Sequence, residues 1–507
     1  MPAENDHGAA NRKVALINFY NPKALGVRFV EKALSDAGFE VTVLHIGGYR
    51  GVRAGKPNEE KIREFLDLTE GELLWIGFSV VSSFFLKIAE EVSDLVRRHT
   101  RAPLVWGGVF ATLLPERCLA HCDYVIRGEG EAASVDFSKR LAAGSDVRDM
   151  PNLVHRQEGE TTINPVRPLE TDLSSIGIAE LGLPNKYFLD DNNGDLYHAD
   201  PCVSSYSYET SASRGCPFAC SFCSTANIRR LYANTPRYMR FRPAGDVIDE
   251  IKRAKERMNK VTLIRFWDEI FSTDPLWIDE FAARYKAEIG LPFEIWTHPL
   301  RTDGTVLRKL RGAGLRLIVM GIQSGSPEVR KKVFRRSESQ EQIIAAAQTM
   351  ADCRIPYVTY DIILGHPLET IDQLKESYDL CSRLPGRFSL QLHGLSFLPG
   401  TDIVEEVIKR GLYTREELEE LMYMPMDRQY SFWNEAKNAD PEMEFWYNLI
   451  FLTQFSFLRG VARRLAKKPA EGKSKKKAAR YYRISRVFSR LRHVRQKGIN
   501  VIRERRK

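Results

Sequence analysis

The stretch RGCPFACSFC, residues 214–223, spaces Cys216, Cys220 and Cys223 as C-x3-C-x2-C. Three thiolates this close on one loop can reach three corners of a cubane iron–sulfur cluster, which usually has four thiolate ligands. No fourth cysteine follows nearby in a matching pattern, so one iron is left open to a small ligand. A zinc site would need a fourth Cys or His at short spacing, and residues 224–260 contain neither. Zinc and inert thiols are therefore the weaker alternatives.

Three further motifs follow this loop in order. Residues 267–271 are WDEIF, residues 321–326 are GIQSGS and residues 365–370 are GHPLET. Together with Phe222, the aromatic residue before the last cysteine, they resemble four marks of the radical S-adenosylmethionine (SAM) superfamily. These are its cluster loop, the acidic end of its second barrel strand, its G-I-E-S-G-S strand and its G-x-P-x-E-T turn. Each later motif alone is weak, but four in this order are a strong signal.

The resemblance implies a partial (β/α)6 barrel with SAM across its top. The open iron would chelate the amino and carboxylate groups of the methionine moiety, and one electron from the cluster would release a 5′-deoxyadenosyl radical. That electron would come from an external reductant of flavodoxin or ferredoxin type. The three cysteines would be the metal ligands and the catalytic residues. The cofactor-binding residues that the resemblance implies here are Phe222, Asp268, Glu269, Gln323, which replaces the usual Glu, Ser324 and Gly365.

Residues 13–140 alternate short apolar runs with segments of helical spacing. The expected strands are Lys13–Phe19, Glu40–Leu44, Leu73–Ser79, Pro103–Trp106 and Asp123–Ile126, and the expected helices are Val27–Ala37 and Phe84–Arg98. This alternation is typical of βαβ units and a parallel sheet. Ligands of such sheets bind outside the carboxyl ends of the strands, which is where the glycines cluster. We expect an α/β, Rossmann-like (flavodoxin-like) domain.

The glycine-rich turns at 77–79, 106–108 and 127–131 resemble the cobalamin-binding domain that precedes the barrel in one radical SAM subfamily. A flat macrocycle needs backbone without a Cβ in the way. Many such domains carry D-x-H-x-x-G after the first strand, and the His binds cobalt. Here the stretch is NPKALG, residues 21–26, with Lys23 in the place of the His. The cofactor-binding residues that this second resemblance implies are Asn21, Lys23, Gly26, Ser79, Gly107, Gly108, Gly128 and Glu129.

A lysine is normally protonated and is a poor cobalt ligand. We therefore expect cobalamin to bind without a histidine below the cobalt. The alternative is a degenerate domain that no longer binds cobalamin.

Five segments are expected along the chain. They are a cobalamin-binding domain at 12–144, a linker at 145–204 that is rich in Pro, Asn, Asp and Gly, a barrel at 205–412, a helical C-terminal domain at 413–466 and a basic tail at 467–507. The barrel strands are expected at Val261–Trp267, Phe293–Thr297, Leu315–Ile322, Tyr357–Leu364 and Phe388–Phe397. The tail opens with Lys467–Lys477, which reads as a Lys-rich linker.

Charge divides the chain unevenly. Residues 459–507 contain 20 Lys or Arg and two acidic residues, a net charge of +18. Because the whole chain has a net charge of +9, the first 458 residues have a net charge of −9. Ile484, Val487, Phe488, Leu491 and Val494 fall on one helical face among arginines. A basic amphipathic helix indicates a membrane-surface or partner helix. A solvated tail is an equal alternative, and nucleic acid is a weaker one because no base-reading module is recognisable.

Several observations favour a cytoplasmic protein. No stretch reaches the ~18 apolar residues that a membrane span needs, and Met1–Lys13 lacks the apolar core of a signal peptide. Three of the eight cysteines lie within residues 216–223, which in a reducing compartment favours metal ligation over disulfides. We expect core positions for the other cysteines, Cys118, Cys122, Cys202, Cys353 and Cys381, and for the apolar run Phe445–Leu458. His298 and His366 are either structural histidines or contacts to a nucleoside or the substrate.

The resemblances favour a cobalamin-dependent radical methyltransferase that acts on an unactivated carbon of a small-molecule or lipid-like substrate. A radical cyclase, rearrangement or oxidation enzyme that uses cobalamin without methyl transfer is the second reading. A non-catalytic cluster and cobalamin sensor is the third.

Overall fold

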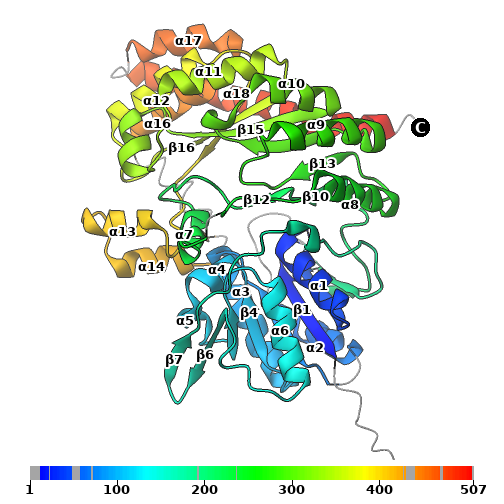
Figure 1. Ribbon diagram of the computed structural model, residues 1–507. Coiled ribbons are helices and arrows are strands. Elements are labelled where there is room, and N and C mark those ends of the chain that lie inside the picture. The colour runs from blue at the N-terminus through cyan, green and yellow to red at the C-terminus, as the bar shows by residue number, and fades with distance from the viewer. Residues whose placement is uncertain are drawn as a thin grey trace, which may run out of the picture.

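The computed structural model describes residues 12–21, 23–47, 57–69, 72–190, 193–235, 237–425, 428–429, 440–468 and 472–504, with side chains up to Leu491 in the last range. Two large sheets organise the chain, and they lie one above the other in Figure 1. The N-terminal sheet is at the bottom of that view and the second sheet is at the top.

The first sheet has at its centre five parallel strands in the order β2-β1-β3-β4-β5, the arrangement of flavodoxin-like folds. This confirms the expected fold class. The strands are β1 (Lys13–Phe19), β2 (Glu40–Gly47), β3 (Trp75–Ser79), β4 (Leu104–Gly107) and β5 (Tyr124–Ile126). The helices between and after them are α1 (Leu25–Asp36), α2 (Glu59–Leu68), α3 (Leu86–His99), α4 (Val109–Leu113), α5 (Pro115–Cys118) and α6 (Glu131–Ala142).

The segment 145–204 is not the linker that its composition indicated. Two hairpins from this segment extend the first sheet, one at each edge. At the β5 edge lie β6 (Leu153–Gln157) and β7 (Glu160–Ile163), and at the β2 edge lie β8 (Lys186–Asp190) and β9 (Asp195–Tyr197). The N-terminal unit therefore continues to about residue 200. Polar loops join these short strands, and the loops dominate the composition of the segment.

The second sheet has six parallel strands in the order β10-β13-β14-β15-β16-β17, as a partial (β/α)6 barrel requires. They are β10 (Ser207–Thr210), β13 (Leu263–Phe266), β14 (Phe293–Thr297), β15 (Leu315–Gln323), β16 (Tyr357–Ile363) and β17 (Ser389–His393). The helices between them are α7 (Ser224–Leu231), α8 (Ala244–Arg257), α9 (Pro275–Arg284), α10 (Gly304–Ala313), α11 (Gln340–Asp352) and α12 (Ile371–Arg383). Two short strands, β11 (Ser213–Arg214) and β12 (Arg240–Phe241), form a separate antiparallel pair.

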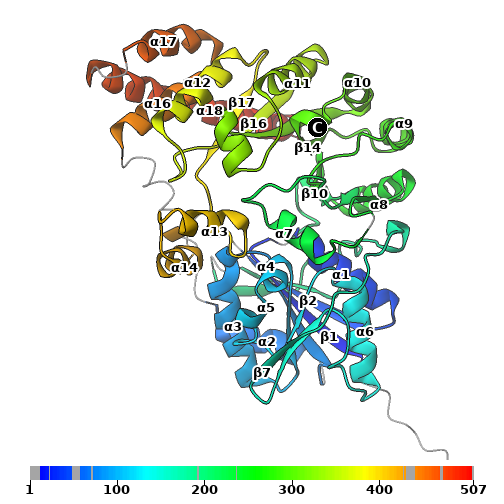
Figure 2. The same cartoon turned by 60° about the vertical axis from the view of Figure 1, so that its left-hand side comes forward.

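The last part of the chain is helical, as expected. α13 (Asp402–Lys409) and α14 (Arg415–Tyr423) lie beside α7, whereas α16 (Pro441–Leu452), α17 (Ser456–Ala466) and α18 (Gly472–Glu504) lie at the far end of the barrel, away from the first sheet (Figures 1 and 2). Phe445 and Trp446 of α16 are buried in the barrel core, and Tyr447 and Phe451 pack against it. This confirms the core reading for most of the run Phe445–Leu458, but the reading is wrong for Phe457, which is exposed. The predicted linker Lys467–Lys477 is wrong in part, because α18 begins at Gly472.

The five cysteines outside the cluster loop are buried, as expected, and form no disulfide. None of the helices in the described ranges is long and apolar enough to cross a bilayer.

Candidate functional site

The three cysteines of the C-x3-C-x2-C motif lie on a loop between β11 and α7, and all three are partly exposed. Cys223 is the N-cap residue of α7. Two hydrogen bonds hold the loop against the barrel. The hydroxyl of Ser221 donates to the Val333 carbonyl (2.5 Å), and its amide donates to the Phe334 carbonyl (3.2 Å). Phe222 packs edge-on against the Phe334 ring, with 5.0 Å between centroids. This contact holds Phe222 in place beside the last cysteine of the loop.

Arg336 supplies a cation beside these thiols. Its guanidinium lies 3.8 Å from Cys220 Sγ as a hydrogen-bond donor. Glu338 Oε1 (2.6 Å) and the carbonyl oxygen of Gly321 (2.7 Å) hold it in place. Burial raises the pKa of the Cys220 thiol, and Arg336 opposes that rise. Hydrogen bonds to cluster sulfurs are among the factors that set a cluster's reduction potential.

The zinc alternative has no geometric support. In the described ranges no group of three or more His, Cys, Asp or Glu side chains is close enough together to hold one metal ion.

The two carboxylates of WDEIF have different surroundings. Asp268 is buried and accepts hydrogen bonds from the Ala212 amide (3.1 Å) and the Ser213 hydroxyl. Burial raises the pKa of Asp268 to about 7. Asp268 therefore fixes the strand that leads into the cluster loop. Glu269 instead lines a cavity, and burial raises its pKa as well.

The two later motifs form turns at the ends of β15 and β16. Gln323 has a left-handed backbone (φ 68°) at an irregular step in the pairing of β15 with β16. Ser324 is buried, and its hydroxyl accepts a hydrogen bond from the Ser326 amide (3.1 Å). Gly365 has a φ of 66°, and its amide donates to Glu369 Oε2 (2.9 Å). These contacts place Ser324 and Gly365 in the framework of the two turns.

His298 and His366 are both buried. The His298 ring stacks on Phe218 of the cluster loop with 3.7 Å between centroids, and its Nδ1 accepts a hydrogen bond from the Leu300 amide (3.1 Å). Neither ring nitrogen of His366 has a hydrogen-bond partner in the described structure. His298 thus contacts the cluster loop directly.

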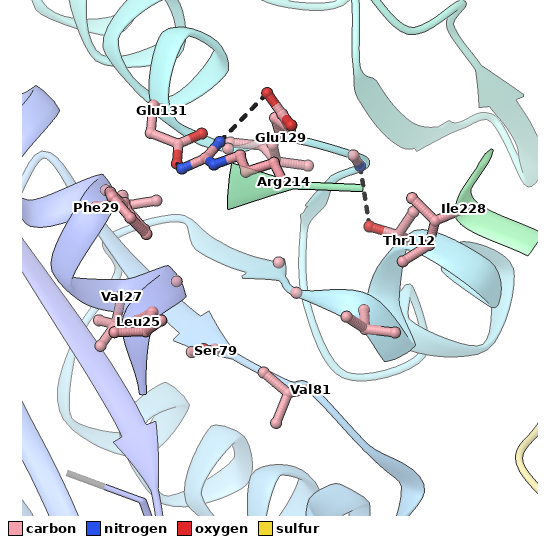
Figure 3. Close-up of a pocket in the computed structure, with 18 of the residues that line it drawn as sticks. Leu25, Val27, Phe29, Ser79, Val81, Thr112, Glu129, Glu131, Arg214 and Ile228 are labelled. Atoms are coloured by element: carbon pink, nitrogen blue, oxygen red, sulfur yellow. Dashed lines mark hydrogen bonds and ion pairs between the residues drawn. The ribbon is translucent and has the colours of Figure 1, made fainter. Parts of the chain in front are cut away.

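A cavity of about 480 Å³ lies between the N-terminal sheet and the cluster loop. One wall comes from the ends of β1, β3, β4 and β5 and the loops that follow them, and the other comes from the segment around Arg214, from α7 and from Trp267 and Glu269. Figure 3 shows apolar side chains, including Leu25, Val27 and Val81, on one side and Arg214 with Glu129 and Glu131 on the other. Of the sequence-predicted residues, this cavity brings together Gly26, Ser79, Gly107, Gly108, Gly128, Glu129 and Glu269.

Glycines line one side of the cavity, which we call the glycine floor: Gly107, Gly108, Gly128 and Gly130. A Cβ at Gly108 would lie 2.7 Å from the Val80 carbonyl oxygen, and one at Gly128 would lie 2.0 Å from the Tyr232 hydroxyl. Both glycines have positive φ angles, 101° and 76°. Larger residues would therefore strain the backbone and overlap with Val80 and Tyr232. A broad, largely apolar cavity with a glycine floor fits the planar macrocycle that the sequence predicts.

Lys23 does not enter this cavity. Its ammonium group donates to Ser207 Oγ (2.7 Å) and pairs with Glu209 (3.4 Å), both on β10 of the barrel. Asn21 accepts a hydrogen bond from the Lys23 amide (3.1 Å) and thus shapes the same loop. No histidine occurs among the described residues that line the cavity. Cobalamin bound without a histidine below the cobalt stays a prediction.

Four charged side chains, which we call the interdomain clamp, close one side of the cavity: Glu129 and Glu131 of the first domain and Arg214 and Arg240 of the second. Arg214 pairs with Glu129 (3.3 Å) and Glu131 (2.5 Å), and Arg240 also pairs with Glu129. The Arg214 guanidinium lies over the Phe29 ring at 4.5 Å. Burial acts to raise the pKa of Glu131, but Arg214 outweighs it and the pKa is lowered.

Sequence reasoning assigned Glu129 to the cofactor and missed the other three members of the clamp. The only available signal was the GEGE run at 128–131, which does not reveal a partner about 80 or more residues away.

Comparison with known proteins agrees with this geometry. The model of the radical SAM superfamily matches residues 210–381, and that of the B12 binding domain matches residues 17–138. The chain belongs to the radical SAM superfamily. It is an enzyme of the group in which a B12-binding domain precedes the radical SAM domain.

The proteins to which the chain is similar include methyltransferases. An uncharacterized methyltransferase of Pyrococcus horikoshii is 25% identical over 64% of this chain and 66% of its own length, just under two thirds. The cytidylyl-2-hydroxyethylphosphonate methyltransferase of Streptomyces wedmorensis is 24% identical over 78% of this chain and 79% of its own length. A cyclase is also similar: the anaerobic magnesium-protoporphyrin IX monomethyl ester cyclase of Cereibacter sphaeroides is 26% identical over 58% and 45%.

Among solved structures, the radical SAM methyltransferase TsrM of Kitasatospora setae aligns with a TM-score of 0.64. The alignment has 19% identity and covers 80% of this chain and 77% of that one. The likeness confirms the fold of both domains.

Proposed function

We propose that this radical SAM enzyme transfers a methyl group to an unactivated carbon of a small-molecule or lipid-like substrate in the cytoplasm. One observation carries the proposal: the candidate cobalamin cavity and the cysteine loop share a wall. Arg214 lines the cavity and stands two residues before Cys216. A methyl donor bound in the cavity and a radical source bound on the cysteine loop would thus be neighbours.

The residues for three cofactors are present. Cys216, Cys220 and Cys223 would hold a [4Fe–4S] cluster, the ends of β15 and β16 would border SAM, and the glycine floor would hold cobalamin. When bound, the cluster supplies the electron that cleaves SAM, and cobalamin supplies the methyl group. Gln323, Ser324 and Gly365 are proposed to border SAM through backbone groups, since their turns are rigid. SAM contacts for Phe222, Asp268 and Glu269 are part of this proposal. So are cobalamin contacts for the residues that line the cavity, Gly26, Ser79, Gly107, Gly108, Gly128 and Glu129.

The chain itself positions and shields these groups. Burial of Asp268 and its contacts with Ala212 and Ser213 fix the entry to the cysteine loop. Arg336 holds a positive charge at Cys220. The interdomain clamp and the apolar wall keep water away from the cavity, which protects reactive species from side reactions.

Lys23→His tests the proposed cobalt environment. Because the Lys23 side chain points to β10, we expect this variant to bind cobalamin without an added axial nitrogen. Leu25→His, on the cavity wall, should add nitrogen hyperfine structure to the cob(II)alamin electron paramagnetic resonance (EPR) spectrum. Nitrogen splitting in Lys23→His instead would show that the loop lies differently.

Product labelling tests methyl transfer. The anaerobically reconstituted protein is incubated with reductant, methyl-labelled SAM and small-molecule or lipid extracts. The label should appear in an extracted compound, and Cys220→Ala should abolish both this label and 5′-deoxyadenosine. Unchanged turnover in Cys220→Ala would refute the cluster assignment.

The similarity to a cyclase favours a second candidate, a radical ring closure, rearrangement or oxidation without methyl transfer. In the same experiment it predicts 5′-deoxyadenosine and a changed substrate with no label. A cluster and cobalamin sensor predicts neither product.

Two partners complete the proposal. A flavodoxin- or ferredoxin-type protein would deliver the electron to the cluster. We also propose a peripheral location at the inner membrane face, through the surface of α17 and α18.

A further inference from the structure

Helix α18 has an apolar stripe on its exposed surface. Ile484, Val487, Phe488 and Leu491 follow the spacing i, i+3, i+4, i+7, which places them on one face of a helix. Their exposed fractions are 48%, 56%, 48% and 59%. Phe457 of α17 is 64% exposed and lies beside the stripe, with 6.1 Å between its ring and that of Phe488. These five residues form what we call the apolar stripe.

The stripe is not the face by which α18 packs on the protein. That face carries Ser474, Ala478 and Ser485, which are buried, and Tyr482, whose ring contacts Tyr447 and Phe451 of α16. α18 is therefore anchored by one side, and the stripe remains uncovered. Contiguous exposed apolar residues of this kind mark interaction sites.

Cations border the stripe. Exposed basic side chains occupy the rest of the described part of α18: Lys473, Lys476, Lys477, Arg480, Arg483, Arg486 and Arg490. In the described ranges none of them forms an ion pair with a carboxylate of this chain. Residues 459–507 carry +18, whereas the remainder of the chain carries −9. The charge that would balance this helix thus comes from outside the protein.

We propose that α17 and α18 dock on an anionic phospholipid bilayer, with the apolar stripe in the acyl boundary and the arginines at the phosphate headgroups. Long basic side chains can lie along apolar surface while their charged ends stay in the polar layer. An apolar face bordered by cations is the arrangement of helices that lie in a membrane interface. A nucleic acid would match the cations but leaves the apolar stripe in water.

This docking leaves the catalytic parts accessible. α17 and α18 lie at the end of the barrel away from the N-terminal sheet, and the cavity lies between the two sheets (Figures 1 and 2). The inference rests on the peripheral location in the proposed function. Its test measures membrane binding alone, so its failure would leave methyl transfer untouched.

The test is sedimentation of the full chain with sucrose-loaded vesicles of phosphatidylcholine alone or with about one third phosphatidylglycerol. The wild type should sediment with the anionic vesicles at least tenfold more strongly than with the neutral ones. Val487→Glu/Leu491→Glu should reduce this binding at least tenfold, because both side chains are on the outer face and the packing face of α18 is unchanged. Leu276→Glu, at an 82% exposed position on α9, is the matched control and should bind like the wild type.

A second pair of measurements separates charge from apolar insertion. Arg483→Gln/Arg486→Gln/Arg490→Gln should weaken binding to anionic vesicles and leave the weak binding to neutral vesicles unchanged. Equal binding to both vesicle types, or full binding by the Val487→Glu/Leu491→Glu variant, would overturn the proposal. So would a homopolymer RNA that binds the wild type and this variant equally, or a self-association that this variant abolishes in the absence of vesicle binding.

Discussion

The guanidinium of Arg336 is held beside the cysteine loop by three hydrogen bonds. It donates to Cys220 Sγ, to Glu338 and to the Gly321 carbonyl. Its neighbour Arg335 points outward and pairs with Asp402 at the surface. The two adjacent arginines thus differ in burial and in what they touch, and Arg335 serves as the control for Arg336 in experiment.

Arg336→Gln should lower the reduction potential of the reconstituted cluster by on the order of 50 mV, since the variant loses a positive charge beside a thiolate and ~59 mV is a tenfold change for one electron. Redox titration followed by EPR measures it. Arg336→Lys, which keeps the charge, should shift the potential less, and Arg335→Gln should not shift it. Equal potentials in Arg336→Gln and the wild type would remove Arg336 from this role.

His366 is a buried residue, and protonation of its ring disfavours the folded state. Burial lowers its pKa to about 3, below the ordinary value of 6.5. The unfolded chain therefore takes up a proton at this site between pH 6.5 and pH 3, and the folded chain does not. Stability from this site is complete above pH 6.5 and is lost as the pH falls through that range.

His366→Leu should remove that loss. At pH 7.5 its apparent stability should be close to that of the wild type, because neither ring nitrogen has a partner to lose. At pH 5 the variant should gain about 2 kcal/mol relative to the wild type, from 1.36 kcal/mol per pH unit. Thermal unfolding of the cofactor-free protein at both pH values measures this, and a parallel fall in both proteins would contradict it.

At the scale of elements, the motif GIQSGS joins β15 to α12 rather than only facing a ligand. A Cβ on Gly325 would lie 2.2 Å from the Ser377 Cα of α12, and the Gly325 amide donates to the Ser377 hydroxyl (2.9 Å). The second glycine of the motif is therefore required where a strand end and a helix touch backbone to backbone.

Gly325→Ala should destabilise the protein by about 3 kcal/mol through this overlap. Gly312→Ala in α10 is the control, since a Cβ there meets nothing within 4 Å, and it should be neutral or slightly stabilising. Thermal unfolding midpoints compare the two. Equal midpoints would show that α12 can move away without cost.

At the scale of the whole molecule, the interdomain clamp is the link between the two cofactor sites. Removal of the Glu131 carboxylate leaves Arg214 with one partner instead of two and opens the edge of the cavity.

Glu131→Ala should therefore reduce cobalamin retained after gel filtration by about tenfold, a change of ~1.4 kcal/mol in binding, while iron and sulfide content stay at the wild-type level. Asp136→Ala on the same helix is the control, because Asp136 pairs with Arg140 and Arg167 of its own domain. Undiminished cobalamin in Glu131→Ala would show that the clamp does not govern retention.

The sequence predicts the parts of this molecule that have local signals. The strands Lys13–Phe19 and Phe293–Thr297 lie where their apolar runs placed them, and the cysteine triplet lies on its loop. Strands β7 and β9 have mostly exposed or half-exposed residues and no apolar run, so their segment read as a linker. Arg336 contacts Cys220 and Arg240 contacts Glu129, and each pair is separated by about 110 residues or more. No spacing rule in the sequence reveals such pairs.

The two sides of the shared cavity are synthesised at different times. Residues that form its two sides leave the ribosome far apart in time, the first by Ser134 and the second only by Glu269. A vitamin as bulky as cobalamin can therefore meet its complete site only after both sides have been synthesised. In a cell short of the vitamin during synthesis, the finished chains would still have to acquire it later.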